Sequence, residues 1–196
     1  MLGRAYLAFS LAVALAGAPT LAHATGDVPA SKRTVLGKYL TAKEAHDRVA
    51  AGKEKVLFLD VRTTGELMFV GGAEEVDAVI PFAEVRQPMV WDDKAGRFAM
   101  AANPSFLQSV DAALAKKGLS KTDTVMVMCR SGDRSAKAVN MLAAAGYTEA
   151  WSVYDGFEGE VSKDGRRSVN GWKNAGLPWS YKLDKSKFML GSAPEK

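Results

Sequence analysis

Short apolar runs alternate along the chain with longer segments whose apolar positions recur at helical spacing. The runs are rich in β-branched residues and are bounded by turn-forming residues, which is typical of buried strands. We predict five strands, at about Val35–Tyr39, Val56–Asp60, Val76–Ile80, Thr124–Met128 and Ala150–Tyr154. Their alternation with helices indicates an α/β domain with a central, mostly parallel five-stranded sheet flanked by helices on both faces.

Three of the intervening segments carry helix start and stop signals. Residues 41–52 open with capping-box spacing at Thr41 and end at a glycine. Residues 103–118 open with Asn103, which is predicted as the N-cap ahead of a proline. Residues 133–146 form the third predicted helix, directly after the fourth strand.

The beginning of the chain has the pattern of a secretory signal peptide. Arg4 supplies a short positive region, Ala5–Ala18 is apolar but too short to span a membrane, and Ala22–Ala24 has the small-x-small form of a cleavage site. We expect cleavage after Ala24 and a periplasmic protein without membrane association, with an uncleaved anchor as the alternative. The expected segments are a signal peptide, a flexible linker, a single domain and a polar tail, at 1–24, 25–33, 34–182 and 183–196.

Composition adds limits on function. The 196 residues, 47% of them hydrophobic and 24% charged, fit one domain with a full-sized core. The formal net charge is +4, and basic residues do not form a block with interleaved aromatics, which argues against nucleic acid as a partner. One cysteine and one histidine beyond the leader give no metal-ligand cluster, so we expect neither a metal nor another cofactor.

The only cysteine, Cys129, lies between the strand at 124–128 and the third predicted helix. Ligands bind at this edge of an α/β sheet, and a helix N-terminus favours anions. The backbone N–H groups of Arg130 through Arg134 can surround the sulfur, and Gly132 permits the tight turn that this requires. We expect this cradle to favour a reactive thiolate. The polar loop argues against burial of the thiol, and a cysteine that is only a small core residue is the alternative.

A second polar cluster follows the strand at 56–60. Asp60 ends that strand, and Arg62 and Glu66 come within the next turn. We expect these three side chains to form a local ion-pair and capping cluster that supports the fold rather than the chemistry.

Three motifs resemble one known family. Cys129–Ser135 (Cys-Arg-Ser-Gly-Asp-Arg-Ser) closely resembles the active-site loop of rhodanese-type sulfurtransferases. Asp60–Arg62 (Asp-Val-Arg) resembles the motif near the start of that domain, and Gly171–Pro178 resembles its C-terminal end. The resemblance covers about Thr34–Tyr181 and implies a single rhodanese-like domain with a central parallel sheet.

The resemblance also implies a double displacement. Cys129 would attack the outer sulfur of a small anionic donor such as thiosulfate, and cyanide or a thiol would then remove the sulfur from the persulfide. A protein acceptor of sulfur is a further candidate partner. By position, Arg134 closes and organises the loop and holds anionic substrate, while Arg130 binds the sulfonate of the donor. The remaining loop residues supply backbone donors or serve the helix start: Ser131, Gly132, Asp133 and Ser135.

The chain departs from the family in several places. The Gly-His-Ile segment of many members is replaced within residues 71–80, where no histidine occurs. A small hairpin at Trp91–Phe98 and a glycine-rich, charged excursion at 158–170 are additions. Whether these two additions border the pocket or only decorate the domain stays open.

Two rival functions remain to be weighed. Phosphatases of the related cysteine-loop type have a longer loop between cysteine and arginine, so the short spacing from Cys129 to Arg134 favours sulfur transfer. A non-enzymatic persulfide carrier, or a protein-binding module that passes sulfur on, needs the same loop and stays open as the alternative.

Overall fold

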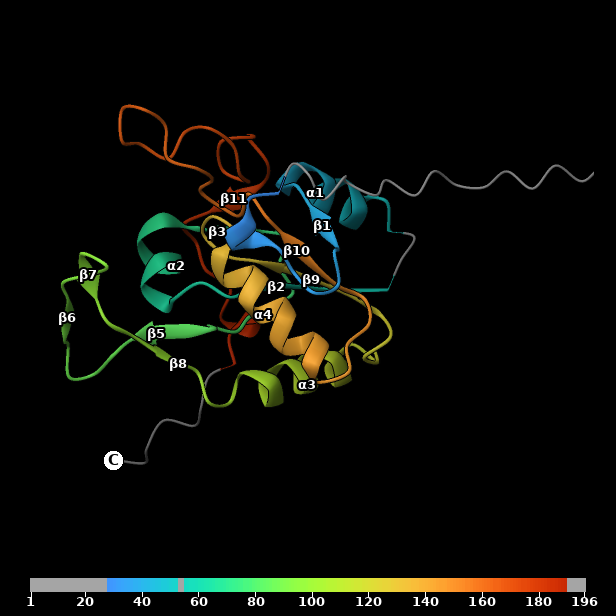
Figure 1. Ribbon diagram of the computed structural model, residues 1–196. Coiled ribbons are helices and arrows are strands. Elements are labelled where there is room, and N and C mark those ends of the chain that lie inside the picture. The colour runs from blue at the N-terminus through green and yellow to red at the C-terminus, as the bar shows by residue number, and fades with distance from the viewer. Residues whose placement is uncertain (1–27, 53–54, 190–196) are drawn as a thin grey trace, which may run out of the picture.

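The computed structural model describes residues 28–52 and 55–189 (Figure 1). Its centre is a five-stranded sheet in the order β1-β10-β9-β2-β4, in which every neighbouring pair is parallel. The strands are β1 (Tyr39–Leu40), β2 (Val56–Asp60), β4 (Ala78–Val79), β9 (Thr124–Met128) and β10 (Ala150–Val153). The predicted fold class is therefore confirmed. β1 begins later than predicted and β4 is shorter.

Two helices cover each face of the sheet (Figure 1). They are α1 (Ala42–Ala50), α2 (Thr64–Val70), α3 (Phe106–Lys116) and α4 (Asp133–Ala144). Leu57 and Leu59 of β2 pack in one core cluster with α3 and α4, whereas Phe58 packs in the other cluster with α1 and α2. Successive strand residues point to opposite faces, so a strand covered on both sides is apolar throughout.

Two capping boxes form within residues 28–52 and 55–189. In α1, the Thr41 hydroxyl accepts from the Glu44 amide at 3.1 Å, and the Glu44 carboxylate accepts from the Thr41 amide at 2.7 Å, as predicted. In α2, Thr63 and Glu66 make the same pair of bonds at 3.1 and 2.9 Å. α2 was not predicted, because its residues were interpreted as a turn after the strand.

The predicted start of α3 is wrong by a few residues. Asn103 does not cap the helix, because its side chain accepts from the Ser105 amide at 3.0 Å in a turn that precedes α3. The helix begins at Phe106, and Ser105 stands at the N-cap without a side-chain capping bond.

Short strands flank the central sheet. The predicted hairpin forms from β6 (Trp91–Asp92) and β7 (Arg97–Phe98). It extends from the antiparallel pair β5 (Ala83–Val85) and β8 (Met100–Ala102), on the α2 side of the molecule in Figure 1. A third antiparallel pair joins β3 (Gly72–Ala73) to β11 (Trp179–Ser180) and so fixes the segment around β11 to the domain.

The described residues of the predicted linker, 28–33, pack on the domain, and so does Phe188 of the predicted polar tail. Val28 and Lys32 are 1% and 4% exposed, and the short 3-10 helix η2 (Ala30–Lys32) contacts α4. Phe188 forms a β-bridge with Val79 beside η3 (Lys185–Lys187). The predicted signal peptide at 1–24 lies outside the described residues and stays a prediction. Among the described helices, none is long and apolar enough to cross a membrane.

Candidate active site

The cysteine loop joins the carboxyl end of β9 to the first turn of α4 (Figure 1). The Gly132 amide donates to Cys129 Sγ at 3.2 Å, and Cys129 Sγ lies 3.7 Å from Ser135 Oγ. Ser135 Oγ in turn donates to the Gly132 carbonyl at 2.8 Å, so it fastens the first turn of α4. We call Cys129 to Gly132 the sulfur cradle. Among the described residues, the N–H groups of Ser131 and Asp133 form no hydrogen bond to the sulfur.

Only glycine fits at position 132. Its φ of 101° and ψ of −26° lie outside the range that side-chain-bearing residues adopt readily. A Cβ atom there would come 2.0 Å from the Tyr154 carbonyl oxygen and 2.8 Å from Lys32 Cδ. Because these neighbours come so close, the residue whose amide donates to the sulfur must be glycine.

Residues 156–159 brace the sulfur cradle from outside. The Phe157 amide donates to the Cys129 carbonyl at 2.8 Å, and the Glu158 amide donates to the Arg130 carbonyl at 2.9 Å. A Cβ at Gly156 would lie 2.6 Å from the Cys129 carbonyl oxygen, so this contact also requires glycine. The beginning of the predicted excursion is thus structural support for the loop.

The excursion at 158–170 leaves and re-enters the domain at one place. A Cβ at Gly159 would lie 1.8 Å from the Asn170 carbonyl oxygen, and one at Gly171 would lie 2.5 Å from the Gly159 nitrogen. Arg167 Nη1 also donates to the Gly159 carbonyl at 2.6 Å. A surface segment whose two ends touch in this way is a compact Ω-type loop.

The thiol is buried, contrary to the expectation from its polar neighbours. Cys129 is 1% exposed and belongs to the core cluster that contains Val125 and Val127. Alternate residues of a strand point to the same face, so the Cys129 side chain points into the same core cluster as Val125 and Val127. Its low exposure restricts the sulfur to small or extended reagents.

Arg134 closes the loop against α2. Its Nη1 and Nη2 atoms donate to the two Glu66 carboxylate oxygens at 2.7 and 2.6 Å, and both side chains are less than a fifth exposed. Glu66 caps α2 and Asp60 pairs with Arg62, as expected, but the ion-pair partner of Glu66 is Arg134 rather than Arg62. Although burial acts to raise it, the Arg134 bonds and charge, with the Thr63 bonds, lower the pKa of Glu66 to about 2.

Arg130 and Asp133 differ from Arg134 in their surroundings. Arg130 is half-buried, and its Nε atom is buried without a hydrogen-bond partner among the described residues. Asp133 is exposed on the first turn of α4, and Ser131 is buried at 7% exposure. Of the two loop arginines, Arg130 is the one that no described carboxylate holds.

Asp60 and Arg62 form a fully buried ion pair. Arg62 Nε lies 3.0 Å from each Asp60 carboxylate oxygen, and Nη2 donates at 2.6 Å. The guanidinium carbon lies 3.9 Å from the centre of the Phe157 ring. Because the Phe157 amide holds the Cys129 carbonyl, this pair supports the sulfur cradle through Phe157.

Asp155 is a supporting residue that the sequence pattern does not reveal. It is 5% exposed, and its carboxylate accepts from the Ala42 amide at 2.8 Å and the Gly171 amide at 3.3 Å. Burial raises the pKa of Asp155 to about 6, against the opposing effect of these bonds and of Lys32. The only signal in the sequence is an Asp-Gly pair directly after a strand, which marks a turn but not its partners.

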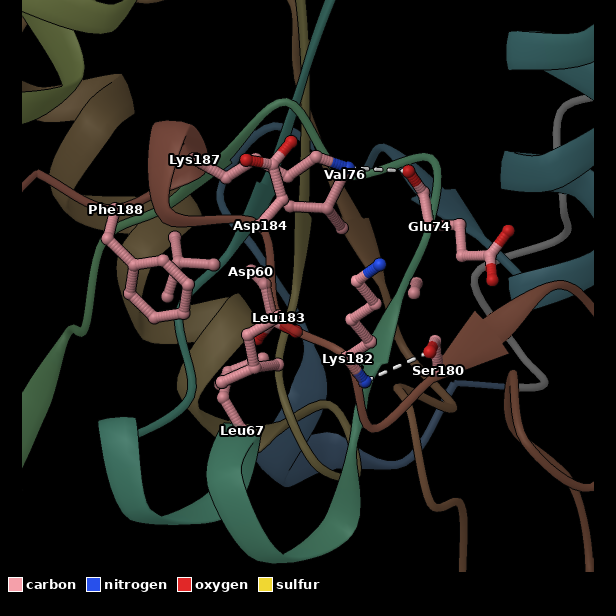
Figure 2. A pocket seen from close by; sticks show the side chains of 13 residues that line it. Asp60, Leu67, Glu74, Val76, Ser180, Lys182, Leu183, Asp184, Lys187 and Phe188 are labelled. Carbon is pink, nitrogen blue, oxygen red and sulfur yellow. Dashed lines mark hydrogen bonds between the residues drawn. The ribbon is translucent and has the colours of Figure 1, made fainter.

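A separate cavity of about 210 Å³ lies between α2, β3, β4 and the C-terminal segment (Figure 2). Leu67, Leu183 and Phe188 give it an apolar interior, and Lys182 lies across it in Figure 2. The residues that line it include Asp60 but not Cys129. The described residues also contain no group of three His, Cys, Asp or Glu side chains able to hold a metal ion.

The Glu66–Arg134 pair predicts an acid-dependent loss of stability. Because the pKa of Glu66 falls from 4.5 to about 2 on folding, its contribution is complete above about pH 4.5 and is lost as the pH falls toward 2. The contribution near neutral pH is about 3 kcal/mol. Denaturant unfolding of the wild type and of Glu66→Gln should differ by an amount that shrinks over this interval. Parallel stability curves for the two proteins would contradict the assignment.

Comparisons with known proteins point to one family. The sequence model of the rhodanese-like domain matches residues 41–162. Thiosulfate sulfurtransferase 16, chloroplastic, from Arabidopsis thaliana is 28% identical over 134 residues, which are 68% of this chain and 85% of that protein. The uncharacterized protein RP600 from Rickettsia prowazekii (strain Madrid E) is 42% identical over 62 residues, which are 31% of this chain and 46% of that protein. The match thus spans less than half the length of RP600.

A solved structure is similar over most of the domain. The crystal structure of Rv0390 from M. tuberculosis superimposes with a TM-score of 0.55 at 29% sequence identity. The superposition covers 74% of this chain and 97% of that chain. With a family match over more than half of the sequence and this shared fold, the chain belongs to the rhodanese-like domain family.

Proposed function

We propose that the protein moves a sulfane sulfur from a donor such as thiosulfate to a thiophilic acceptor, through a persulfide on Cys129. The observation that carries this proposal is the sulfur cradle itself. The only thiol of the chain lies at the strand–helix junction, and the Gly132 amide donates to its sulfur at 3.2 Å. Membership of the rhodanese-like family and similarity to a thiosulfate sulfurtransferase support sulfur transfer in general.

The proposed reaction has two displacements. The Cys129 thiolate attacks the outer sulfur of thiosulfate, the S–S bond of the donor breaks, and sulfite leaves with its electron pair. The resulting persulfide is held by the Gly132 N–H and by the positive end of α4. Cyanide or a thiol then attacks the outer sulfur, and the Cys129 thiolate leaves and is regenerated.

The proposed roles of the two arginines differ. Arg134 is bound through both terminal nitrogens by Glu66, so it positions the loop against α2 and stabilises negative charge from a fixed place. No carboxylate in the described part of the chain holds Arg130, so it is the proposed contact for the sulfonate of the donor.

The proposal is tested by steady-state turnover of thiosulfate with cyanide, together with intact-mass analysis after exposure to the donor alone. We expect ping-pong kinetics and the mass gain of one sulfur atom. A persulfide without turnover would identify a sulfur carrier instead. Turnover of an aryl phosphate without any reaction of thiosulfate would identify a phosphatase.

A further inference from the structure

The segment before the first strand crosses α4 and reaches the sulfur cradle. Val28 is buried, and the Val35 amide donates to Asn140 Oδ1 of α4 at 2.8 Å. Between them, Lys32 is 4% exposed, which is rare for a lysine. Lys32 precedes the residues that the rhodanese-like domain matches, so its place in the site is visible only in the structure.

The stem of Lys32 lies against Gly132. A Cβ on Gly132 would meet Lys32 Cδ at 2.8 Å and the Tyr154 carbonyl oxygen at 2.0 Å. Both neighbours therefore crowd the side of Gly132 where a Cβ would stand. Glycine has more accessible backbone conformations than other residues, so the φ of 101° observed at Gly132 depends on such close neighbours.

The ammonium group of Lys32 anchors this stem. Its Nζ atom donates to the Tyr154 carbonyl at 3.1 Å and forms an ion pair with the Glu160 carboxylate. Tyr154 and Glu160 lie on either side of residues 156–159, which brace the cradle from outside. Lys32 thus joins the amino-terminal segment, the cradle and its outer support.

We propose that Lys32 is a positioning residue of the sulfur cradle. Its stem holds Gly132 so that the Gly132 amide meets the sulfur, and Tyr154 and Glu160 hold the stem. This inference rests on the proposed role of Cys129. Loss of the stem should let Gly132 relax, weaken the hydrogen bond to the sulfur, and slow the reaction of Cys129 with the donor.

The test compares Lys32→Ala, which loses the stem and the charge, with Lys32→Met, which keeps most of the stem. Lys32→Ala should lower kcat about tenfold with little change in KM, since small displacements at a reacting centre are costly, and Lys32→Met should lower it about threefold. The rate at which thiosulfate alone adds one sulfur atom to the protein, followed by intact mass in a single turnover, should fall in the same order.

Lys38→Met is the matched control. Lys38 also forms an ion pair, with Glu149, but at the amino end of β10, away from the cradle. We expect its kcat and sulfur-loading rate to equal those of the wild type. Should Lys32→Ala fail to fold, Lys32→Met and Glu160→Gln carry the comparison.

Wild-type kcat and sulfur-loading rate in every folded Lys32 variant would overturn the inference. The loading rate reports the step at Cys129 directly and needs no cyanide. Failure of the proposed function, seen as equal turnover by wild type and Cys129→Ala, is therefore distinguishable from failure of the role of Lys32.

Discussion

Cys129→Ser should reduce thiosulfate:cyanide turnover by at least about a thousandfold. The hydroxyl can accept the Gly132 hydrogen bond that the sulfur accepts now, at 3.2 Å, and can keep the contact with Ser135. It remains protonated near neutral pH and forms no stable adduct with sulfane sulfur. Activity is measured as thiocyanate produced per enzyme, and the persulfide by intact mass.

Cys129→Ala completes this experiment, because the buried thiol also packs in the core. Alanine keeps the apolar character of the position, whereas serine keeps its hydrogen bonding. Neither can form a persulfide, so both variants should be inactive and unchanged in mass after exposure to thiosulfate. More than a tenth of wild-type turnover in either variant would show that Cys129 is a structural residue only.

Gly132→Ala should be both inactive and destabilised. The new Cβ would lie 2.0 Å from the Tyr154 carbonyl oxygen, and a backbone atom cannot yield as a flexible side chain can. The left-handed backbone alone costs about 1–2 kcal/mol in a residue with a side chain, and relief of the clash adds to it, for a total of about 3 kcal/mol. Displacement of the Gly132 amide should lower kcat at least about a hundredfold.

Gly146→Ala is the matched control for this change. Gly146 follows the other end of α4 and has a φ of 91°, but a Cβ there would meet nothing within 4 Å. Gly146→Ala has the conformational cost of a left-handed backbone without the clash. We therefore expect the free energy of unfolding to fall by about 1 kcal/mol and the turnover to equal that of the wild type. Equal stability and activity in the two alanine variants would refute the claim that close packing at Gly132 shapes the site.

The central strands could be predicted because burial on both faces leaves a continuous apolar signature. β2 and β9 have the predicted bounds, and both are covered by helices on each side. Cys129 could also be placed at the end of β9. The burial of Cys129 could have been predicted too, because it lies two residues beyond Val127 and four beyond Val125, and alternate residues of a strand point to the same face.

The missed features depend on partners that are distant in the sequence. Glu66 and Arg134 are 68 positions apart, and Lys32 and Glu160 are 128 positions apart, so no local period relates them. α2 was different, because Thr63 and Glu66 have the same capping-box spacing that identified α1. Its short length and the glycine in its first turn concealed the helix.

The closed base of the excursion at 158–170 makes it an exchangeable module. Its two ends meet backbone to backbone at Gly159 and Gly171, so the domain on either side is joined at one point. Glu160 and Arg167 belong to the fixed part, because Glu160 holds Lys32 and Arg167 donates to the Gly159 carbonyl. Between them, the interval from 162 to 166 is a place where a foreign recognition loop can be grafted without redesign of the scaffold.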